Sequence, residues 1–307
     1  MRVRARPGGS VLAAVAVFLF ASGLFSPAAT ASRPPVSALV AKNTAPYQRA
    51  LAAFKRAYDG PVSTHVLDFE GDALEAIRRE KPALVLAVGV KAAKLAAGLG
   101  PAVPVVYCMV VEPRANGVEG GHLVGVPLEI PVETQLAQLR RLAPEARSVG
   151  LVFNPARSAG RLGEALSAAA GLGMTVVAEP ASSAAQFPDA LQQILPKAQA
   201  LWLLSDPTVV TQDTFRLMLE AAMARRLPLL TFSDEFVRLG ALLALAPDFE
   251  GAGIEAARLA LEIVNGKSPT EAGPGRPQWN LVVNLATAKA LGLTVPADVL
   301  KAAIAVQ

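Results

Sequence analysis

The chain has 307 residues but only one cysteine and two histidines. The single cysteine, Cys108, excludes an intrachain disulfide, and its place in the apolar stretch VVYCMVV favours a packed core side chain over a nucleophile. His65 and His122 are too few for a transition-metal site of ordinary composition. Dinucleotide-binding, phosphate-loop, zinc-protease and serine-hydrolase motifs are also absent. The sequence therefore predicts no metal, no cofactor and no enzyme activity.

Charged residues make up 18% of the chain, and its net charge is +4. Three basic residues, Arg2, Arg4 and Arg6, precede an apolar run, Val11–Phe25, which small residues follow. This order is typical of a cleaved signal peptide, here residues 1–31; the alternative is a retained anchor, for which the run is short. After that segment, 26 basic and 25 acidic side chains remain, so we expect export to the periplasm and no nucleic-acid partner.

Short apolar strands alternate with amphipathic helices from Val36 onward, and the pattern then repeats in a second half. Strands are expected at 36–41, 62–69, 84–88, 103–110, 148–153, 174–178, 201–204, 227–232, 241–246 and 279–284. Helices are expected after Tyr47, Asp72 and Lys91 and near 159–171, 184–195, 211–225, 250–264, 286–291 and 297–305. This alternation predicts an α/β fold of two Rossmann-like lobes, each with a parallel sheet covered on both faces. The lobes are expected at 32–126 plus 241–277 and at 127–240 plus 278–307.

The two halves share one plan at their strand ends. VAKNTAPY (40–47) and LVFNPARS (151–158) end the first strand of each half, and LVLAVGVKAAK (84–94) corresponds to LWLLSDPTVVT (201–211) at the third. Ligands of open parallel sheets bind beyond the carboxyl ends of the strands. The loops at these ends are therefore expected to surround one ligand site.

Several stretches resemble a bacterial family of ABC-transporter substrate-binding proteins whose better-known members bind aromatic amino acids. NLVVNLATAKALGLTVPADVLKAA (280–303) is similar to the family's C-terminal signature, and residues 122–155 are similar to its crossover into the second domain. LWLLSDPTVV and LPLLTFSDEFVRLGALLAL are similar to its second-domain ligand loops. The resemblance implies the type I periplasmic-binding fold, with two α/β lobes, a hinge of three connecting segments and a ligand closed between the lobes.

The resemblance also implies six ligand loops. Carried over by position, they are Asn43–Tyr47, Gly89-Val90, Val111–Pro113, Asn154–Ser158, Ser205–Thr208 and Ser233–Glu235. The candidate ligand-binding residues are Asn43, Tyr47, Gly89, Val90, Glu112, Asn154, Ser205, Asp206, Thr208, Ser233 and Asp234. Two of them depart from the family's pattern, because Val90 stands where relatives have threonine and Glu112 where they have aspartate. Val90 cannot donate the side-chain hydrogen bond that a threonine could.

The candidate residues suggest how a zwitterion could be held. Asp234 or the neighbouring Glu235, and Glu112 from the other half, could accept a ligand ammonium through charge-assisted hydrogen bonds. Free backbone N–H groups where a helix begins near 205–208 could hold a carboxylate. Tyr47 could stack on a ligand ring.

Each assignment has a structural alternative. Asp206 could cap a helix with Pro207 at its first position, or Thr211 could cap a helix that begins later. Tyr47 belongs to the apolar helix face that is expected to pack in the core. Asn43 and Asn154, which end equivalent strands, could serve only to form a turn. Asp234 and Glu235, if they lie on an extended segment, would point to opposite sides.

These observations predict a soluble periplasmic solute-binding protein of an ABC import system. It would bind a small zwitterionic ligand, an amino acid or similar, in the cleft between the lobes, and an ABC permease in the inner membrane would be its partner. Ligand contacts available only in the closed state would shift the population toward closure. We expect a monomer. The alternatives are a ligand-sensing module that reports to a membrane receptor and an α/β enzyme.

Overall fold

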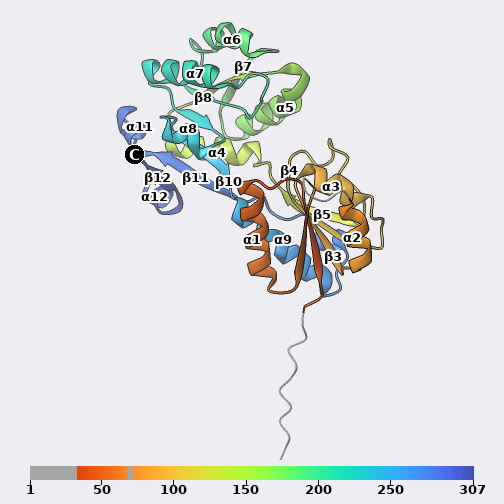
Figure 1. The fold of residues 1–307 in the computed structure, drawn as a ribbon. Coiled ribbons are helices and arrows are strands. Elements are labelled where there is room, and N and C mark those ends of the chain that lie inside the picture. Colours follow the sequence, from red (N-terminus) through yellow and green to blue (C-terminus); the bar gives the residue numbers. More distant parts are fainter. Residues whose placement is uncertain (1–32, 68–71) are drawn as a thin grey trace, which may run out of the picture. The chain divides into compact units, whose positions relative to one another are not determined.

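The computed structural model describes residues 33–67 and 72–307. The expected signal peptide, residues 1–31, lies outside the described residues. Within them, no helix is both long and apolar enough to cross a membrane. The described residues form two β-sheets, each flanked by helices, as the α/β alternation predicts (Figure 1).

The first sheet contains five parallel strands in the order β2-β1-β3-β4-β5. Its strands are β1 (Val36–Val40), β2 (Val62–Val66), β3 (Leu84–Val88), β4 (Val105–Val110) and β5 (Leu123–Pro127). The helices around it are α1 (Ala45–Tyr58), α2 (Ala73–Glu80), α3 (Val90–Ala97), α9 (Phe249–Val264) and α10 (Pro269–Ala272). Four of the five strands are expected from the sequence, and β5 is not.

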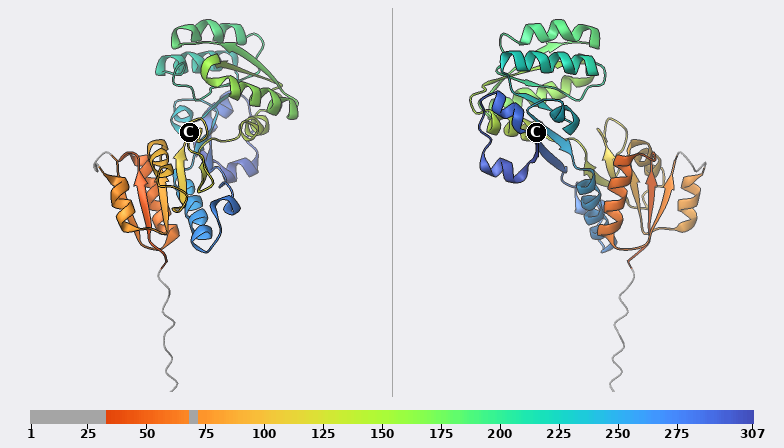
Figure 2. Two further views of the ribbon diagram at one scale, coloured as in Figure 1. Left: turned by 90° about the vertical axis from the view of Figure 1, so that its right-hand side faces the viewer. Right: turned by 60° about the vertical axis from the view of Figure 1, so that its left-hand side comes forward.

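Successive side chains of a strand point to opposite faces of the sheet. The apolar strands of the first sheet therefore present two apolar faces, and helices cover both. Val36, Ala38 and Val40 of β1 pack in one core with α1 and α9, whereas Leu39 packs in a second core with α2 and α3. Figure 1 shows these two pairs of helices on opposite sides of the sheet. Helices α1 and α9 are far apart in sequence but lie side by side (Figure 2). Gly253 permits this contact, since a Cβ there would lie 2.1 Å from the Ala50 carbonyl oxygen.

The second sheet contains seven strands in the order β12-β11-β10-β9-β8-β6-β7. Its strands are β6 (Ser148–Phe153), β7 (Thr175–Pro180), β8 (Ala200–Trp202), β9 (Leu229–Thr231), β10 (Leu243–Pro247), β11 (Trp279–Asn284) and β12 (Ile304–Val306). All neighbouring strands are parallel except β10 and β11, which are antiparallel. The expected two lobes with parallel sheets are thus confirmed, and β11 is the one strand of the second sheet that runs antiparallel to its neighbour β10.

Helices cover both faces of this sheet as well. They are α4 (Val132–Leu142), α5 (Pro155–Gly171), α6 (Phe187–Ile194) preceded by a 3₁₀ turn (Ala184–Gln186), α7 (Gln212–Arg225), α8 (Asp234–Arg238), α11 (Leu285–Ala290) and α12 (Ala297–Ala302). One core joins α4, α5, α11 and α12 to the sheet and contains Trp202, which is 1% exposed. A second core lies under α6 and α7, which run side by side (Figure 2).

Strand β10 corrects the expected boundary between the lobes. The sequence analysis placed residues 241–277 with the first lobe, but β10 pairs with β9 and β11 in the second sheet. Leu243 and Leu245 pack in the core of that sheet together with Val283 of β11. The chain returns to the first sheet only with α9. The expected helix at 297–305 is likewise shorter, because its last residues form β12.

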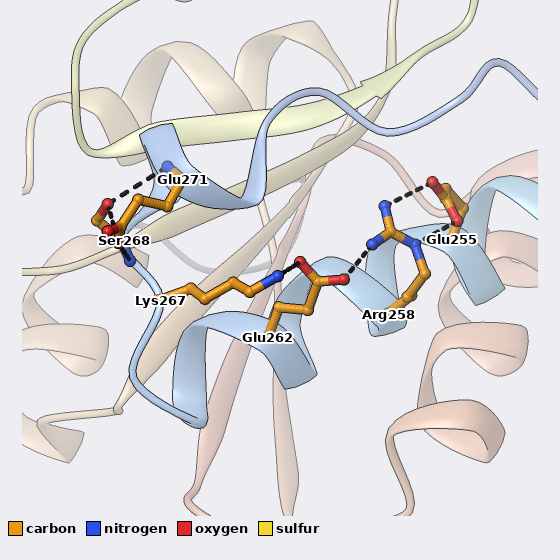
Figure 3. Close-up of polar contacts among 6 residues, drawn as sticks. All are labelled: Glu255, Arg258, Glu262, Lys267, Ser268 and Glu271. Atoms are coloured by element: carbon orange, nitrogen blue, oxygen red, sulfur yellow. Dashed lines mark hydrogen bonds and ion pairs between the residues drawn. The ribbon is translucent and has the colours of Figure 1, made fainter.

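A chain of ion pairs runs along the outer side of α9 (Figure 3). Arg258 binds both carboxylate oxygens of Glu255, at 2.8 and 2.9 Å, and also contacts Glu262. Lys267 Nζ lies 3.0 Å from the second oxygen of Glu262. Glu255 Oε1 accepts the backbone N–H of Arg276 as well, at 3.0 Å. The same carboxylate thus fixes α9 and the segment that leads into β11.

Candidate functional site

The two sheets have the same arrangement at their centres. In the first sheet β1 lies between β2 and β3, and in the second β6 lies between β7 and β8. β2 is added on one side of β1 and β3 on the other, so the order in which strands are added across the sheet reverses between β1 and β3. The same reversal occurs between β6 and β8. In open α/β sheets such a switch point leaves a crevice at the carboxyl ends of the strands. The correspondence of β3 with β8 is confirmed, and four of the six expected ligand loops lie at these two points.

A hydrogen-bonded group of four side chains occupies the switch point of the second sheet. Ser158 Oγ donates to Asp206 Oδ2 at 2.6 Å, and Thr208 donates to Asp206 Oδ1 from its hydroxyl at 2.6 Å and from its N–H at 2.9 Å. Asn154 Nδ2 donates to the Thr208 hydroxyl at 2.7 Å, while its Oδ1 accepts the N–H of Ala156. We call Asn154, Ser158, Asp206 and Thr208 the polar quartet. It joins the loops after β6 and β8.

Asp206 carries a negative charge within this quartet although it is only 2% exposed. Burial alone would raise the pKa of its carboxyl group, but hydrogen bonds from Ser158 and Thr208, with the nearby Arg157, hold the pKa below its ordinary value. Its first oxygen already accepts two hydrogen bonds and its second accepts one. An ionised side chain in this position favours cationic or neutral ligand groups nearby and disfavours anionic ones.

Helix α7 begins later than Asp206. Thr211 is its N-cap, and Thr211 and Thr214 form a reciprocal capping box. The interpretation of Asp206 as the N-cap is therefore wrong, and the Thr211 alternative is confirmed. Asp206 instead bonds to the N–H of Thr208 two residues on, which shapes the loop. Ser205, next to it, is exposed.

Ser233 and Asp234 begin a short helix after β9. Ser233 caps α8 by accepting the N–H of Glu235 at 3.2 Å, and Asp234 lies 3.6 Å from Arg238 one turn later. Asp234 and Glu235 are thus helical, and the assumption of an extended segment at this point is wrong. Both carboxylates reach the surface, where Asp234 is half-buried and Glu235 is exposed.

The switch point of the first sheet is built differently. Gly89 follows β3 with a φ of +93°, and a Cβ at this position would lie 2.9 Å from the ring of Tyr47. The Tyr47 ring therefore packs directly on the Gly89 backbone, where burial raises the pKa of its phenol. No side chain caps either α1 after Thr44 or α3 after Gly89. Val90 is the first residue of α3, and Asn43 is exposed.

Glu112 lies after β4 in a left-handed conformation, with a φ of +43°. Its N–H donates to Glu129 Oε1, and its carbonyl oxygen accepts the N–H of Asn116 at 2.9 Å. These contacts hold the loop, while the Glu112 side chain itself is exposed.

An apolar groove of about 800 Å³ lies beside the quartet and was not foreseen from the sequence. Its lining comes from the 205–212 loop, α7 and α8, with Phe215, Phe232 and Phe236 as its aromatic part. The ring centroids of Phe215 and Phe236 lie 4.2 Å apart, and those of Phe232 and Phe236 lie 5.3 Å apart. Their spacing in sequence gives no common period, so only the fold brings the three together.

The described residues hold no group of three or more His, Cys, Asp and Glu side chains that could bind a metal ion. Cys108 is fully buried, and burial raises the pKa of its thiol to about 12. A thiol with this pKa stays protonated at neutral pH and is a poor nucleophile.

Comparison with known proteins gives one family. A sequence model described as ABC transporter substrate binding protein matches residues 70–307, which is more than half of the chain. A curated relative, a tyrosine-binding protein of Clostridioides difficile (strain R20291), is 22% identical over 223 residues. That alignment covers 70% of this chain and 64% of the relative, so it spans less than two thirds of the relative's length.

Two solved structures show the same fold. A ligand-free, open structure of a substrate-binding protein with adhesive properties from Clostridium difficile has a TM-score of 0.76 at 17% identity, covering 89% of this chain and 99% of that one. An ABC domain in complex with L-Trp from Streptococcus pneumonia has a TM-score of 0.59 at 18% identity, covering 90% and 100%. The two-sheet topology and these matches correspond to the type I periplasmic-binding fold.

Proposed function

The chain belongs to the ABC transporter substrate-binding protein family, and from this premise we propose that it binds a small zwitterion, an amino acid or similar, for an import system. Members of the family bind a small molecule outside the cytoplasm for a transporter and are not enzymes. We further propose that residues 1–31 direct the chain to the periplasm, where it acts as a monomer with an inner-membrane permease.

The polar quartet is the observation that carries this proposal. Its side chains satisfy one another before any ligand arrives, so the loops after β6 and β8 do not need to be ordered by binding. Preorganisation of this kind lowers the entropic cost of association. The relatives named for tyrosine and L-Trp lend support to an amino-acid ligand.

The charge of Asp206 suggests an orientation for the zwitterion. The carboxylate of Asp206 is ionised and already accepts the backbone N–H of Thr208. Residues 205–208 therefore suit a ligand carboxylate poorly. Helices α1 and α3, which begin beside each other at the first switch point without side-chain caps, offer free backbone N–H groups and a positive helix end. The ligand carboxylate would lie there, in contact with Asn43, Tyr47, Gly89 and Val90.

The ligand ammonium would then face the acidic residues of the remaining loops. Asp234 and Ser233 at the start of α8 and Glu112 after β4 are the proposed partners, because Asp234 and Glu112 carry carboxylates that reach the surface. Asp234 lies 3.6 Å from Arg238, and both side chains are at least partly exposed. Such a contact contributes little to stability. A ligand ammonium could replace this contact at small cost.

Thermal unfolding in the presence of the twenty amino acids, nucleosides and sugars tests the proposal. A ligand at 100 times its Kd should add about 2.7 kcal/mol to the free energy of unfolding. We expect an amino acid to raise the melting temperature and Asp234→Asn to weaken its binding about tenfold. Asp213→Asn is the matched control, since Asp213 is an exposed carboxylate in the first turn of α7. A shift by sugars alone would contradict the zwitterion.

A further inference from the structure

Two of the three chain segments that connect the sheets are bonded to each other. The chain passes between the two sheets after β5, after β10 and before β11. Strands β10 and β11 pair antiparallel as far as Pro247 opposite Trp279, and the N–H of Asp248 then donates to the carbonyl oxygen of Gln278 at 2.9 Å. We call β10 and β11, with Asp248 and Gln278, the connecting ribbon.

The connecting ribbon ends at the start of α9, which packs on the first sheet. Asp248 is the N-cap of this helix, because its Oδ1 accepts the N–H of Gly251 at 2.9 Å. A Cβ at Gly251 would lie 2.6 Å from Asp248 Oδ2 and 3.1 Å from the Cβ of Gln278. The missing side chain lets α9 begin directly against both residues. Asp248 thus caps the helix and pairs with the other connection at the same time.

The segment between α10 and β11 is held on the first sheet as far as Arg276. The N–H of Gly275 donates to the carbonyl oxygen of Gly125 in β5, and the N–H of Arg276 donates to Glu255 Oε1 in α9, both at 3.0 Å. A Cβ at Gly275 would lie 3.0 Å from Val126 and 3.1 Å from Glu255. The backbone of this segment therefore lies tightly against both β5 and α9.

The carboxylate that accepts the Arg276 N–H is itself fixed in place. Arg258 binds both oxygens of Glu255 (Figure 3), and the Glu255 side chain is only 14% exposed. Hydrogen bonding from Arg258 holds the pKa of Glu255 below its ordinary value, so this acceptor is charged at neutral pH. Hydrogen bonds to charged acceptors are stronger than those between neutral groups. Glu255 is thus a firm anchor for the segment that leads into β11.

Only a few residues lie between the part fixed to the first sheet and the paired strands of the second. They are Pro277 and Gln278 on one connection and Asp248 on the other. Proline fixes its φ at about −65°, and hinges absorb changes of φ and ψ at a few such residues. We propose that the connecting ribbon moves as one body with the second sheet and bends only at Asp248 and Pro277-Gln278, and that Glu255 is the positioning residue that fixes this pivot.

This inference goes beyond the proposed function, because it concerns how the two halves move and requires no assumption about the ligand. Its tests are therefore made on the protein without ligand. Failure of the pivot and failure of the zwitterion proposal would be separate results.

Distances between two spin labels, measured in a matched pair of proline variants, test the pivot. The labels are attached through Lys94→Cys in α3 and Ala224→Cys in α7, both at exposed positions, whereas the native Cys108 is fully buried. Pro277→Gly frees φ at the pivot, and Pro274→Gly makes the same change within the held segment. We expect Pro277→Gly to broaden the distance distribution and Pro274→Gly to leave it unchanged. Equal widths in the two variants would overturn the proposal.

Variants of Glu255 test its role as the anchor. Glu255→Ala leaves the N–H of Arg276 without its acceptor, so this amide should exchange its hydrogen at least about tenfold faster, and the label distances should broaden. Glu255→Gln keeps a side-chain oxygen for the same N–H and should preserve the narrow distribution. Glu262→Ala is the control, since Glu262 contacts Arg258 and Lys267 on the same side of α9 but not Arg276.

Two results would refute the role of Glu255. One is a distance distribution that Glu255→Ala leaves unchanged or that Glu262→Ala broadens equally, because the pivot would then not depend on this carboxylate. The other is a loss of amide protection throughout α9 in Glu255→Ala, because the side chain would then stabilise the helix rather than fix the segment beside it. The proposal predicts that protection within α9 is kept.

Discussion

The two switch points of this protein occupy equivalent places in their sheets but differ in how their polar groups are satisfied. In the second sheet, Asn154 and Thr211 cap the helices that follow β6 and β8, and the polar quartet closes the loops between them. In the first sheet, α1 and α3 begin without side-chain caps. Orphan N–H groups at a helix start must find water or a ligand. The second switch point is thus held by its own side chains, whereas the helices of the first begin without such contacts.

The close packing of Tyr47 on Gly89 gives the largest expected effect. In Gly89→Ala the new Cβ would lie 2.9 Å from the Tyr47 ring at a φ of +93°, so strain and overpacking should lower the free energy of unfolding by about 2–4 kcal/mol. Gly100→Ala has a similar φ, +87°, with no atom within 4 Å, and should cost only about 1–2 kcal/mol.

Chemical denaturation of both glycine variants measures the difference. Tyr47→Ala combined with Gly89→Ala should recover part of the loss, because the ring that meets the new Cβ is gone. If Gly89→Ala and Gly100→Ala were equally stable, the packing of Tyr47 on Gly89 would not constrain the first switch point.

Removal of the Asp206 carboxylate should have the next largest effect. Asp206→Ala leaves the donors of Ser158 and Thr208 without their acceptor, which should cost about 1–3 kcal/mol of unfolding free energy. Asp213→Ala removes an exposed carboxylate from the same part of the chain and should stay within about 0.5 kcal/mol of wild type. Urea denaturation of the two variants checks this contrast, and similar stabilities would show that the quartet contributes little.

The quartet should also make stability depend on pH. Hydrogen bonds hold the pKa of Asp206 below its ordinary value in the folded state despite burial, so the contribution of this carboxylate is complete above the unfolded pKa of about 3.9. It is lost as the pH falls through the lower folded pKa. The difference in unfolding free energy between wild type and Asp206→Asn should therefore shrink between pH 5 and pH 2. A difference that is the same at both values would contradict the ionised state of Asp206.

The comparison of the halves also shows how far the sequence could predict the fold. Continuous apolar strands such as Leu84–Val88 and Ser148–Phe153 were found because they are buried on both faces and bounded by turns. Strand β10 has the same apolar character. The sheet to which it belongs, however, is decided by its pairing with β9 and β11, and a local sequence pattern does not encode this pairing. Strand β12, with three residues, is too short to give any period.

The candidate site was predictable where strand ends determine it and not where tertiary contacts do. Asn154 and Asp206 follow apolar strands, and thus their place at the switch point could be inferred. Whether Asp206 caps a helix or bonds to Ser158, 48 residues away, depends on how two loops meet. The aromatic groove was missed for the same reason, since Phe215, Phe232 and Phe236 come from different elements.

Calorimetric titration of one amino acid and its derivatives tests the central claim most directly. The amino acid that stabilises the protein most in the thermal screen is compared with its carboxamide and its N-acetyl form. A zwitterion held by its carboxylate at α1 and α3 and by its ammonium at α8 requires both charges, so each derivative should bind at least about 100-fold more weakly. A carboxamide and an N-acetyl form that bind as tightly as the parent amino acid would contradict the account.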